Sequence, residues 1–237
     1  MTISIQSSTV VPEGDGVEVK RLMPVANLRN FDPFVLWDHF DIAGGGFPNH
    51  PHRGFEAITY MFDGGMKHKD NLGNQGTVFG GGAQRFTAGK GIVHSEMPDK
   101  KAVGIQLWIN LPQRLKSVEP DYQQVDVIAG TEQDGVNIHT IVGGGGSIQL
   151  KTDVEYLDVA LGKGVRWKKS IANDFRGFVY VVEGSLTLNT ETLHTGQAAF
   201  IEHEEALELL AVKHSRVMWC FGRPHGEPIY QHGPFVD

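Results

Sequence analysis

Hydrophobic positions along this chain come in short runs that are separated by glycine-rich turns. Apolar or alternating runs of five or six residues cover positions 57–62, 105–109, 155–160 and 177–182. Clusters of glycine interrupt the chain between such runs, for example at 44–46, 80–82 and 143–146. Short strands with turn signals roughly every 8 to 12 residues are typical of a β-sandwich or β-barrel. We therefore predict an all-β fold.

One of these runs has a counterpart in the second half of the chain. Residues 56–64 and 177–184 both lead from apolar positions into an acidic residue followed by glycine, and each is followed by another turn and strand. We interpret this as two copies of one β-barrel, with a first domain over residues 1–130 and a second over 131–237. The polar, proline-bounded stretch 111–120 is the best candidate for a linker.

Two pairs of polar residues in the first half have the spacing of metal ligands. His50 and His52 are two positions apart, as are His94 and Glu96. Residues i and i+2 of a strand share a face, so on neighbouring strands three imidazoles and one carboxylate would point at one centre. That set suits iron, copper, manganese or zinc and leaves positions open for a substrate or dioxygen. Residues 173–175 stand where the second copy should have its histidines, so we expect that copy to lack a metal.

The residues around these ligands are expected to be structural. We interpret the other histidines as surface or hydrogen-bonded side chains, with His68 as a candidate for the mouth of a cavity. Arg53 follows His52 directly, so alternation predicts that it points to the opposite face and forms a structural salt bridge.

Composition and charge exclude several classes of function. The chain has 237 residues, 40% of them hydrophobic, and a formal net charge of −7. No cluster of lysine and arginine stands out, so direct binding to nucleic acid is not expected. The single Cys220 excludes an intrachain disulfide, fits a reducing compartment and, from its apolar neighbours, is an inert core thiol. No segment resembles a leader peptide or a membrane span, so we expect a cytoplasmic monomer, or a nuclear one in a eukaryote.

The candidate ligands lie in motifs that resemble a known family. The spacing of glycines and histidines over residues 44–64, followed by a second motif that ends at His94, is similar to the two signature motifs of the cupin superfamily. The match is closer to the pirins, through NHPHRGFE at 49–56 and TAGKGIVHSE at 87–96. Looser similarities to the same family are NFDPF at 30–34 and HGPFV at 232–236.

Resemblance to the pirins implies a bicupin fold, two jelly-roll barrels in tandem with one mononuclear metal in the N-terminal barrel. Carried over residue by residue, the ligands are His50, His52, His94 and Glu96. The implied ion is iron(II), with copper, manganese, nickel, cobalt and zinc as alternatives. Glu56 competes for the carboxylate position, because many other cupins use a glutamate near this offset. We favour Glu96, which shares a strand face with His94, and expect Glu56 to face the cavity or to support the ligands.

The same resemblance implies two functions. The first is quercetin 2,3-dioxygenase activity, in which dioxygen opens a flavonol, a small aromatic substrate, with loss of carbon monoxide. Glu96 is then the candidate catalytic base for the flavonol hydroxyl. Such a substrate needs an apolar pocket of about 300 Å³ or more, and the aromatic candidates to line it are Phe47, Phe55, Phe79, Phe86 and Trp108. The alternative is a non-catalytic, iron-dependent redox sensor that acts as a co-regulator by binding other proteins.

Overall fold

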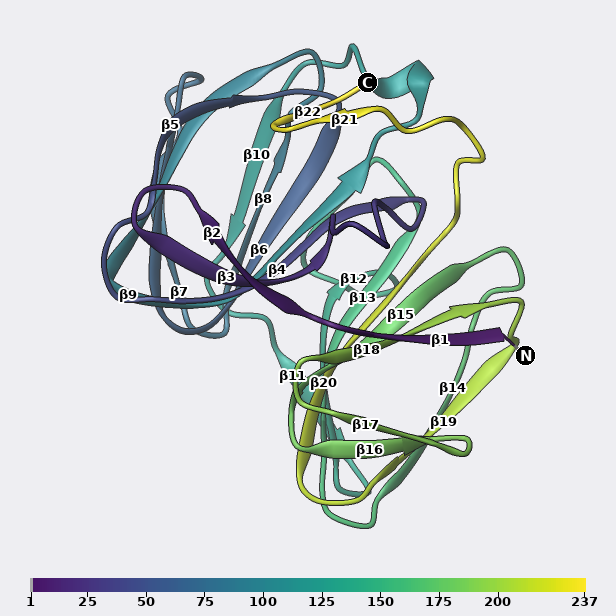
Figure 1. The fold of residues 1–237 in the computed structure, drawn as a ribbon. Helices are drawn as coiled ribbons and strands as arrows, with labels where there is room; N and C mark the ends of the chain where they lie inside the picture. The colour runs from purple at the N-terminus through teal and green to yellow at the C-terminus, as the bar shows by residue number, and fades with distance from the viewer. Residues whose placement is uncertain (1) are drawn as a thin grey trace. The chain divides into compact units, whose positions relative to one another are not determined.

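The chain folds as two units of β-sheet, in agreement with the predicted all-β class (Figure 1). The computed structural model describes residues 2–237. We call residues 9–128 and 225–237 the first unit, and residues 2–8 and 129–224 the second unit. Within the described residues, helical structure is confined to one 3-10 turn, Gln113–Leu115, and no helix is long and apolar enough to cross a bilayer.

The first unit is built on a large antiparallel sheet with the strand order β10-β8-β6-β9-β4-β3-β2. Its strands are β2 (Thr9–Glu13), β3 (Val17–Met23), β4 (Phe34–Ile42), β6 (Phe55–Asp70), β8 (Ala83–Thr87), β9 (Ile92–Asn110) and β10 (Asp121–Val125). Side chains from several strands form one buried cluster, which includes Val35, Phe55, Ala57, Phe86 and Trp108. The alternation of side chains along each strand therefore decides which residues enter the interior.

Two long strands of this unit continue the same nine-stranded sheet into a second part, β5-β9-β6-β7, which we call the small sheet of the first unit. The last part of β6 pairs with the first part of β9, so that Asp70 lies opposite His94. On the outer sides, β5 (Phe47–His52) pairs with β9 and β7 (Gln75–Phe79) pairs with β6. The pairing of β6 with β9 shifts register on either side of Gly64. Gly64 has φ +69°, and a Cβ there would lie 2.0 Å from the Lys101 carbonyl oxygen, so glycine is required at this irregularity.

The second unit repeats this arrangement. Its large sheet has the order β1-β18-β15-β20-β13-β12-β11, and its small sheet has the order β14-β19-β16-β17. The strands are β1 (Thr2–Ser7), β11 (Gly130–Gln133), β12 (Val136–Val142), β13 (Val154–Leu161), β14 (Arg166–Ser170), β15 (Arg176–Glu183), β16 (Ser185–Leu188), β17 (Glu191–His194), β18 (Gln197–Glu202), β19 (Ala206–Ala211) and β20 (Ser215–Gly222). The two large sheets correspond strand for strand, and β5-β9-β6-β7 corresponds to the small sheet. The architecture is the bicupin fold, two cupin-type barrels from a repeated pattern.

The ends of the chain are exchanged between the units, which differs from the expected domains 1–130 and 131–237. The chain passes from the first unit to the second between residues 128 and 129, close to the expected position. However, β1 pairs with β18 of the second unit, Ser7 opposite Gln197, and holds the edge that β10 holds in the first unit. Figure 1 shows this purple strand beside β18. A short alternating strand carries no local signal of its partner, so the sequence pattern does not reveal this exchange.

Residues 225–237, which we call the strap, belong to the first unit. They contain the small hairpin of β21 (Gln231–His232) and β22 (Phe235–Val236), drawn in yellow in Figure 1. The Val236 amide donates to the Arg53 carbonyl at 3.1 Å. Gly54 permits this approach, because a Cβ there would lie 1.8 Å from the Val236 carbonyl oxygen. The glycine of the HPHRG motif is therefore a packing site for the strap.

The stretch 111–120 was expected to be a linker. It is instead part of the first unit. Lys116 Nζ donates to the carbonyl oxygens of Gly54 and Val236 at 3.0 and 2.8 Å, and to Asn110 Oδ1 at 2.8 Å. A lysine held by three acceptors ties this segment to the strap and to the end of β5. Its proline-bounded polar sequence reflects a 3-10 turn that is packed in place rather than a free connection.

Cys220 lies in the core of the second unit, as predicted. The side chain is 0% exposed on β20, and burial raises the pKa of its thiol well above the usual value. A protonated, buried thiol is a poor nucleophile and a poor metal ligand.

Deletion of residues 2–8 should selectively loosen the second unit. Without β1, the edge of β18 loses its antiparallel partner, so amide hydrogens of residues 197–202 should exchange much faster with deuterium. Amides of β9 in the first unit should keep their protection and serve as the internal control. Hydrogen–deuterium exchange with mass spectrometry measures both; unchanged exchange in β18 would contradict the strand exchange.

Candidate metal centre

The three predicted histidine ligands meet on the small sheet of the first unit. His50 and His52 lie on β5, and His94 lies on the first part of β9, where it is the direct cross-strand neighbour of His50. One ring nitrogen from each lies within 4.8 Å of the others. The ring centroids of His50 and His94 are 4.5 Å apart, and those of His52 and His94 are 5.0 Å apart. The i, i+2 spacing and the pairing of two strands thus produce the predicted convergence.

Backbone carbonyl groups fix the tautomers of two of these imidazoles. His50 Nδ1 lies 2.7 Å from the Pro48 oxygen, and His52 Nδ1 lies 3.1 Å from the Pro234 oxygen in the strap. A carbonyl oxygen only accepts, so each Nδ1 carries a hydrogen and each Nε2 presents a lone pair. This is the outer hydrogen bond that metal-bound histidines generally make. The arrangement therefore fits a cation between the rings.

Burial and mutual proximity keep two of the imidazoles, those of His52 and His94, neutral. Burial, together with the neighbouring His94 and His50, lowers the pKa of His52 to about 3. Burial and the neighbouring His50 and His68 lower the pKa of His94 to about 2. Neutral imidazoles are the form that binds metals, so these two rings need not lose a proton before they coordinate an ion near pH 7.

Glu96 lies beside this group, held by neutral donors. Its Oε1 accepts from Thr59 Oγ1 at 2.9 Å and from Gln84 Nε2 at 2.7 Å, and its Oε2 accepts from Gln106 Nε2 at 2.6 Å. Trp108 Nε1 donates to Gln106 Oε1 at 2.9 Å and so orients that amide. Each carboxylate oxygen has about two acceptor lone pairs, so Oε2 keeps one free. The close imidazole group among the described residues does not include Glu96, and its role as a ligand stays a prediction.

Glu56 lies on the other face of β6, contrary to the expectation that it faces the cavity or supports the ligands. Its Oε1 accepts from Thr87 Oγ1, its cross-strand neighbour on β8, at 2.8 Å. The adjacent pair, Ala57 and Phe86, points to the histidine side, where Phe86 stacks on His52 with centroids 5.6 Å apart. Alternation along β6 therefore turns Glu56 away from the site.

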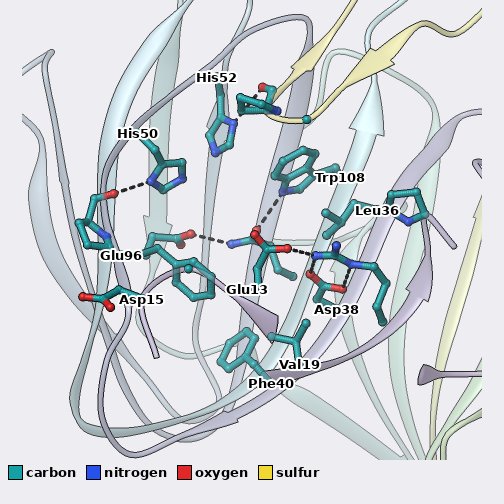
Figure 2. A pocket seen from close by; sticks show the side chains of 18 of the residues that line it. Glu13, Asp15, Val19, Leu36, Asp38, Phe40, His50, His52, Glu96 and Trp108 are labelled. Carbon is teal, nitrogen blue, oxygen red and sulfur yellow. Dashed lines mark hydrogen bonds and ion pairs between the residues drawn. The ribbon is translucent and has the colours of Figure 1, made fainter. Parts of the chain in front are cut away.

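A cavity of about 580 Å³ opens onto the site. Figure 2 shows His50 and Glu96 on one side of it, Leu36 on the other, and the neighbouring rings of His52 and Trp108 between them. Of the five aromatic candidates, Phe47 and Trp108 line the cavity. Phe55 and Phe86 instead pack against His52, and Phe79 is 54% exposed elsewhere.

The polar wall of this cavity contains one prominent arginine. Arg21 donates to both oxygens of Asp38 at 2.8 and 2.6 Å, and to Glu13 at 2.6 Å. The guanidinium charge is thereby matched within the wall, and the apolar surface of Val19, Phe40 and Met66 lies in the same cavity. A largely apolar pocket with a few fixed polar groups is typical of small-molecule sites.

His68 and Asp70 lie behind His94, not at the cavity mouth where His68 was expected. Both side chains are 0% exposed, with His68 Nε2 3.1 Å from Asp70 Oδ2. His68 Nδ1 lies 3.5 Å from His94 Nδ1. The signal that was missed is again the i, i+2 spacing, which puts His68 and Asp70 on one face of β6.

Outside the centre, Arg53 behaves as predicted. It points away from His52 and forms an ion pair with Asp237 at 2.7 Å, and its guanidinium lies 4.2 Å from the Phe235 ring centre. In the second unit, the strand that corresponds to β5 is β14, not residues 173–175 as was expected. β14 carries the sequence RWKKS, which contains no metal-binding side chain of the histidine, cysteine or carboxylate type.

Known proteins resemble this chain along most of its length. The family model described as Pirin matches residues 16–109, and that described as Pirin C-terminal cupin domain matches residues 156–237. A pirin-like protein of Caulobacter vibrioides is 40% identical over 245 residues, which cover 94% of this chain and 87% of the relative.

Two solved structures share the fold. A quercetin 2,3-dioxygenase from Acinetobacter baumannii is 27% identical, with a TM-score of 0.89 over 98% of this chain and 90% of the other. The bacterial pirin YhhW from Escherichia coli, solved in complex with nickel(II), is 27% identical, with a TM-score of 0.80 over 94% of this chain and 99% of the other. The likeness therefore extends over both units.

The metal-free protein should lose stability as the pH falls below about 6.5, the ordinary pKa of histidine. In this range the unfolded chain protonates His52 and His94, whereas the folded protein keeps them neutral, since their pKa values are about 3 and 2. Stability from these rings is present above pH 6.5 and is lost toward lower pH, by at most roughly 1.4 kcal/mol per pH unit for each ring. Urea unfolding between pH 7.5 and 5 measures this slope. The His52→Gln/His94→Gln variant is the control, and an identical slope in it would contradict the assignment.

Proposed function

The chain belongs to the pirin family, and from that premise we propose that it is a mononuclear metal protein with quercetin 2,3-dioxygenase activity. The observation that carries the proposal is the convergence of three imidazoles at the wall of a cavity large enough for a flavonol. Two relatives support it, one a quercetin 2,3-dioxygenase and one a pirin that was solved with nickel(II).

The spacing of the ring nitrogens supports a transition metal. His50 Nε2 and His94 Nε2 lie 3.1 Å apart. Two nitrogens bound to one ion at about 2.1 Å, at adjacent positions, are about 3.0 Å from each other. We propose that iron(II) is held by His50, His52 and His94, with Glu96 Oε2 as the fourth ligand atom. Such an ion supplies Lewis acidity toward a hydroxyl group and one-electron chemistry toward dioxygen.

The cavity supports an aromatic, polyhydroxylated substrate. Trp108, Phe47 and Leu36 offer apolar surface for the rings of a flavonol, and the volume of about 580 Å³ exceeds the roughly 300 Å³ at which pockets for such molecules begin. Arg21 and Glu13, in the polar part of the cavity wall, offer hydrogen bonds to the hydroxyl groups of the substrate. These residues bind and orient the substrate and exclude water from the site.

Glu96 is the proposed base for the substrate hydroxyl. Its three donors are neutral, so they fix the carboxylate without cancelling its charge. The remaining lone pair on Oε2 can bind either a metal ion or a proton, but not both at once. From this oxygen Glu96 would accept the proton of the substrate hydroxyl, while the three imidazoles would hold the ion.

Oxygen uptake with quercetin tests the proposal. The iron-loaded protein should consume dioxygen when quercetin is added, and the His52→Ala variant should not, because it loses a ligand. No uptake by a protein with one bound iron would overturn the enzymatic function and favour the iron-dependent sensor that binds other proteins.

The two glutamates should respond differently to the same substitution. Glu96→Gln removes the base and should lower kcat about 100- to 10,000-fold, whereas Glu56→Gln, on the opposite face of β6, should leave kcat within about twofold. Iron content measured in each variant separates a lost ligand from a lost base. Equal kcat values for Glu96→Gln and the wild type would remove Glu96 from the mechanism.

A further inference from the structure

A hydrogen-bonded chain of side chains leads away from His94 into the protein. His94 Nδ1 lies 3.5 Å from His68 Nδ1, and His68 Nε2 lies 3.1 Å from Asp70 Oδ2. All three residues are buried, at 1%, 2% and 8% exposure. The His68 ring lies parallel to Tyr122, with centroids 4.3 Å apart and planes at 19°. His68 and Asp70 are therefore packed behind His94 and do not line the cavity.

Asp70 is fixed by the turn that follows it. Its Oδ1 accepts from the backbone amides of Leu72 and Asn74 at 2.9 and 3.0 Å, and its Oδ2 accepts from Asn74 Nδ2 at 2.9 Å. An ionised carboxylate has no hydrogen to donate. The fourth partner, His68 Nε2, must therefore carry the hydrogen of that bond.

With a neutral His68 ring, this one assignment sets the other protons of the chain. With the hydrogen on Nε2, the neutral His68 ring has a lone pair on Nδ1, which accepts from His94 Nδ1. His94 then has its own lone pair on Nε2, which points at His50 Nε2 at 3.1 Å. Two lone pairs that face each other at this distance are an arrangement that a cation between them would stabilise. The orientation of His94 as a ligand therefore starts from Asp70.

We propose that His68 and Asp70 are positioning residues that set the tautomer of His94 and strengthen it as a metal ligand. The inference rests on the proposed metal centre and extends it to two side chains outside the cavity. Carboxylate partners raise the basicity of metal-bound histidines, and here the effect reaches His94 through a second imidazole. The Nδ1 atoms of His50 and His52 donate to backbone carbonyl oxygens, whereas that of His94 faces a side chain. His94 is therefore the ring of the three whose basicity depends on side chains.

The tautomers can be observed without any metal. Long-range proton–nitrogen correlation spectra of the metal-free protein should show hydrogen on Nδ1 of His94 and on Nε2 of His68. Variants that lack one ring assign the signals. Hydrogen on Nε2 of His94 in the wild type would overturn the inference, whatever the protein does with iron.

Asp70→Asn is the sharpest test with a metal. The new amide can keep accepting from the turn, but its nitrogen then faces His68 Nε2–H as a second donor. The hydrogen of His68 then moves to Nδ1. There it faces the hydrogen on His94 Nδ1, so the hydrogen bond between the two rings is lost. Nickel(II) affinity, measured by calorimetry, should fall about 10- to 100-fold. Asn74→Ala is the matched control, because it removes another bond to Asp70 Oδ2 without touching His68, and it should keep wild-type affinity.

Substitutions of His68 separate its acceptor atom from its bulk. His68→Phe keeps a ring beside Tyr122 but offers no acceptor to His94, whereas His68→Asn offers an amide oxygen near the position of Nδ1. Nickel(II) affinity should be weakest in His68→Phe and partly restored in His68→Asn, and the reduction potential of bound iron should rise in both. Equal affinities and potentials in wild type, Asp70→Asn and His68→Phe would overturn the inference. A wild-type protein that binds no metal would overturn the metal centre and this inference with it.

Discussion

The pairing of β5 with the first part of β9 is the constraint on which the site depends. It puts His50 opposite His94, with His52 two positions away on the same face. A slip of one residue would turn both β5 histidines outward, because side chains alternate between faces. Contacts on both faces hold the register: His52 packs against Phe86 and Trp108 inside, and Arg53 pairs with Asp237 outside. The geometry of the centre is thus set by the register of β5 against β9, which these side-chain contacts hold.

Local alternation explains what was predictable from the sequence. The shared faces of His50 with His52 and of His94 with Glu96, the outward turn of Arg53 and the all-β class all follow from a period of two, which needs no knowledge of distant partners. The orientation of Glu56 also follows from that period, once Phe86 is known to face His52. The same period connects His68 to Asp70, but their relation to His94 depends on β6 extending past its register shift to pair again with β9. Such long-range pairing is not encoded in any short window of sequence.

The two barrels show that sheet order does not determine chemistry. In the second unit, β14 takes the position that β5 has in the first. There Lys169 forms an ion pair with Glu155 at 2.8 Å, and the Trp167 ring meets the edge of Trp219 with centroids 5.4 Å apart. An ion pair and an aromatic contact occupy the strand that carries the histidines in the other barrel. The same architecture holds a histidine cluster in one barrel and an ion pair with an aromatic contact in the other. The identity of a few inward side chains decides between the two.

The strap has a consequence for how the protein is made. The carbonyl of Pro234 that orients His52 lies 182 residues further along the chain. A ribosome therefore completes every histidine of the centre, and then the whole second barrel, before it synthesises that carbonyl. Until then His52 lacks the partner that fixes its tautomer, and the Arg53 side of β5 is uncovered. Completion of this histidine cluster is accordingly a late step of biosynthesis, and a nascent chain interrupted before residue 225 carries the three histidines without the Pro234 carbonyl.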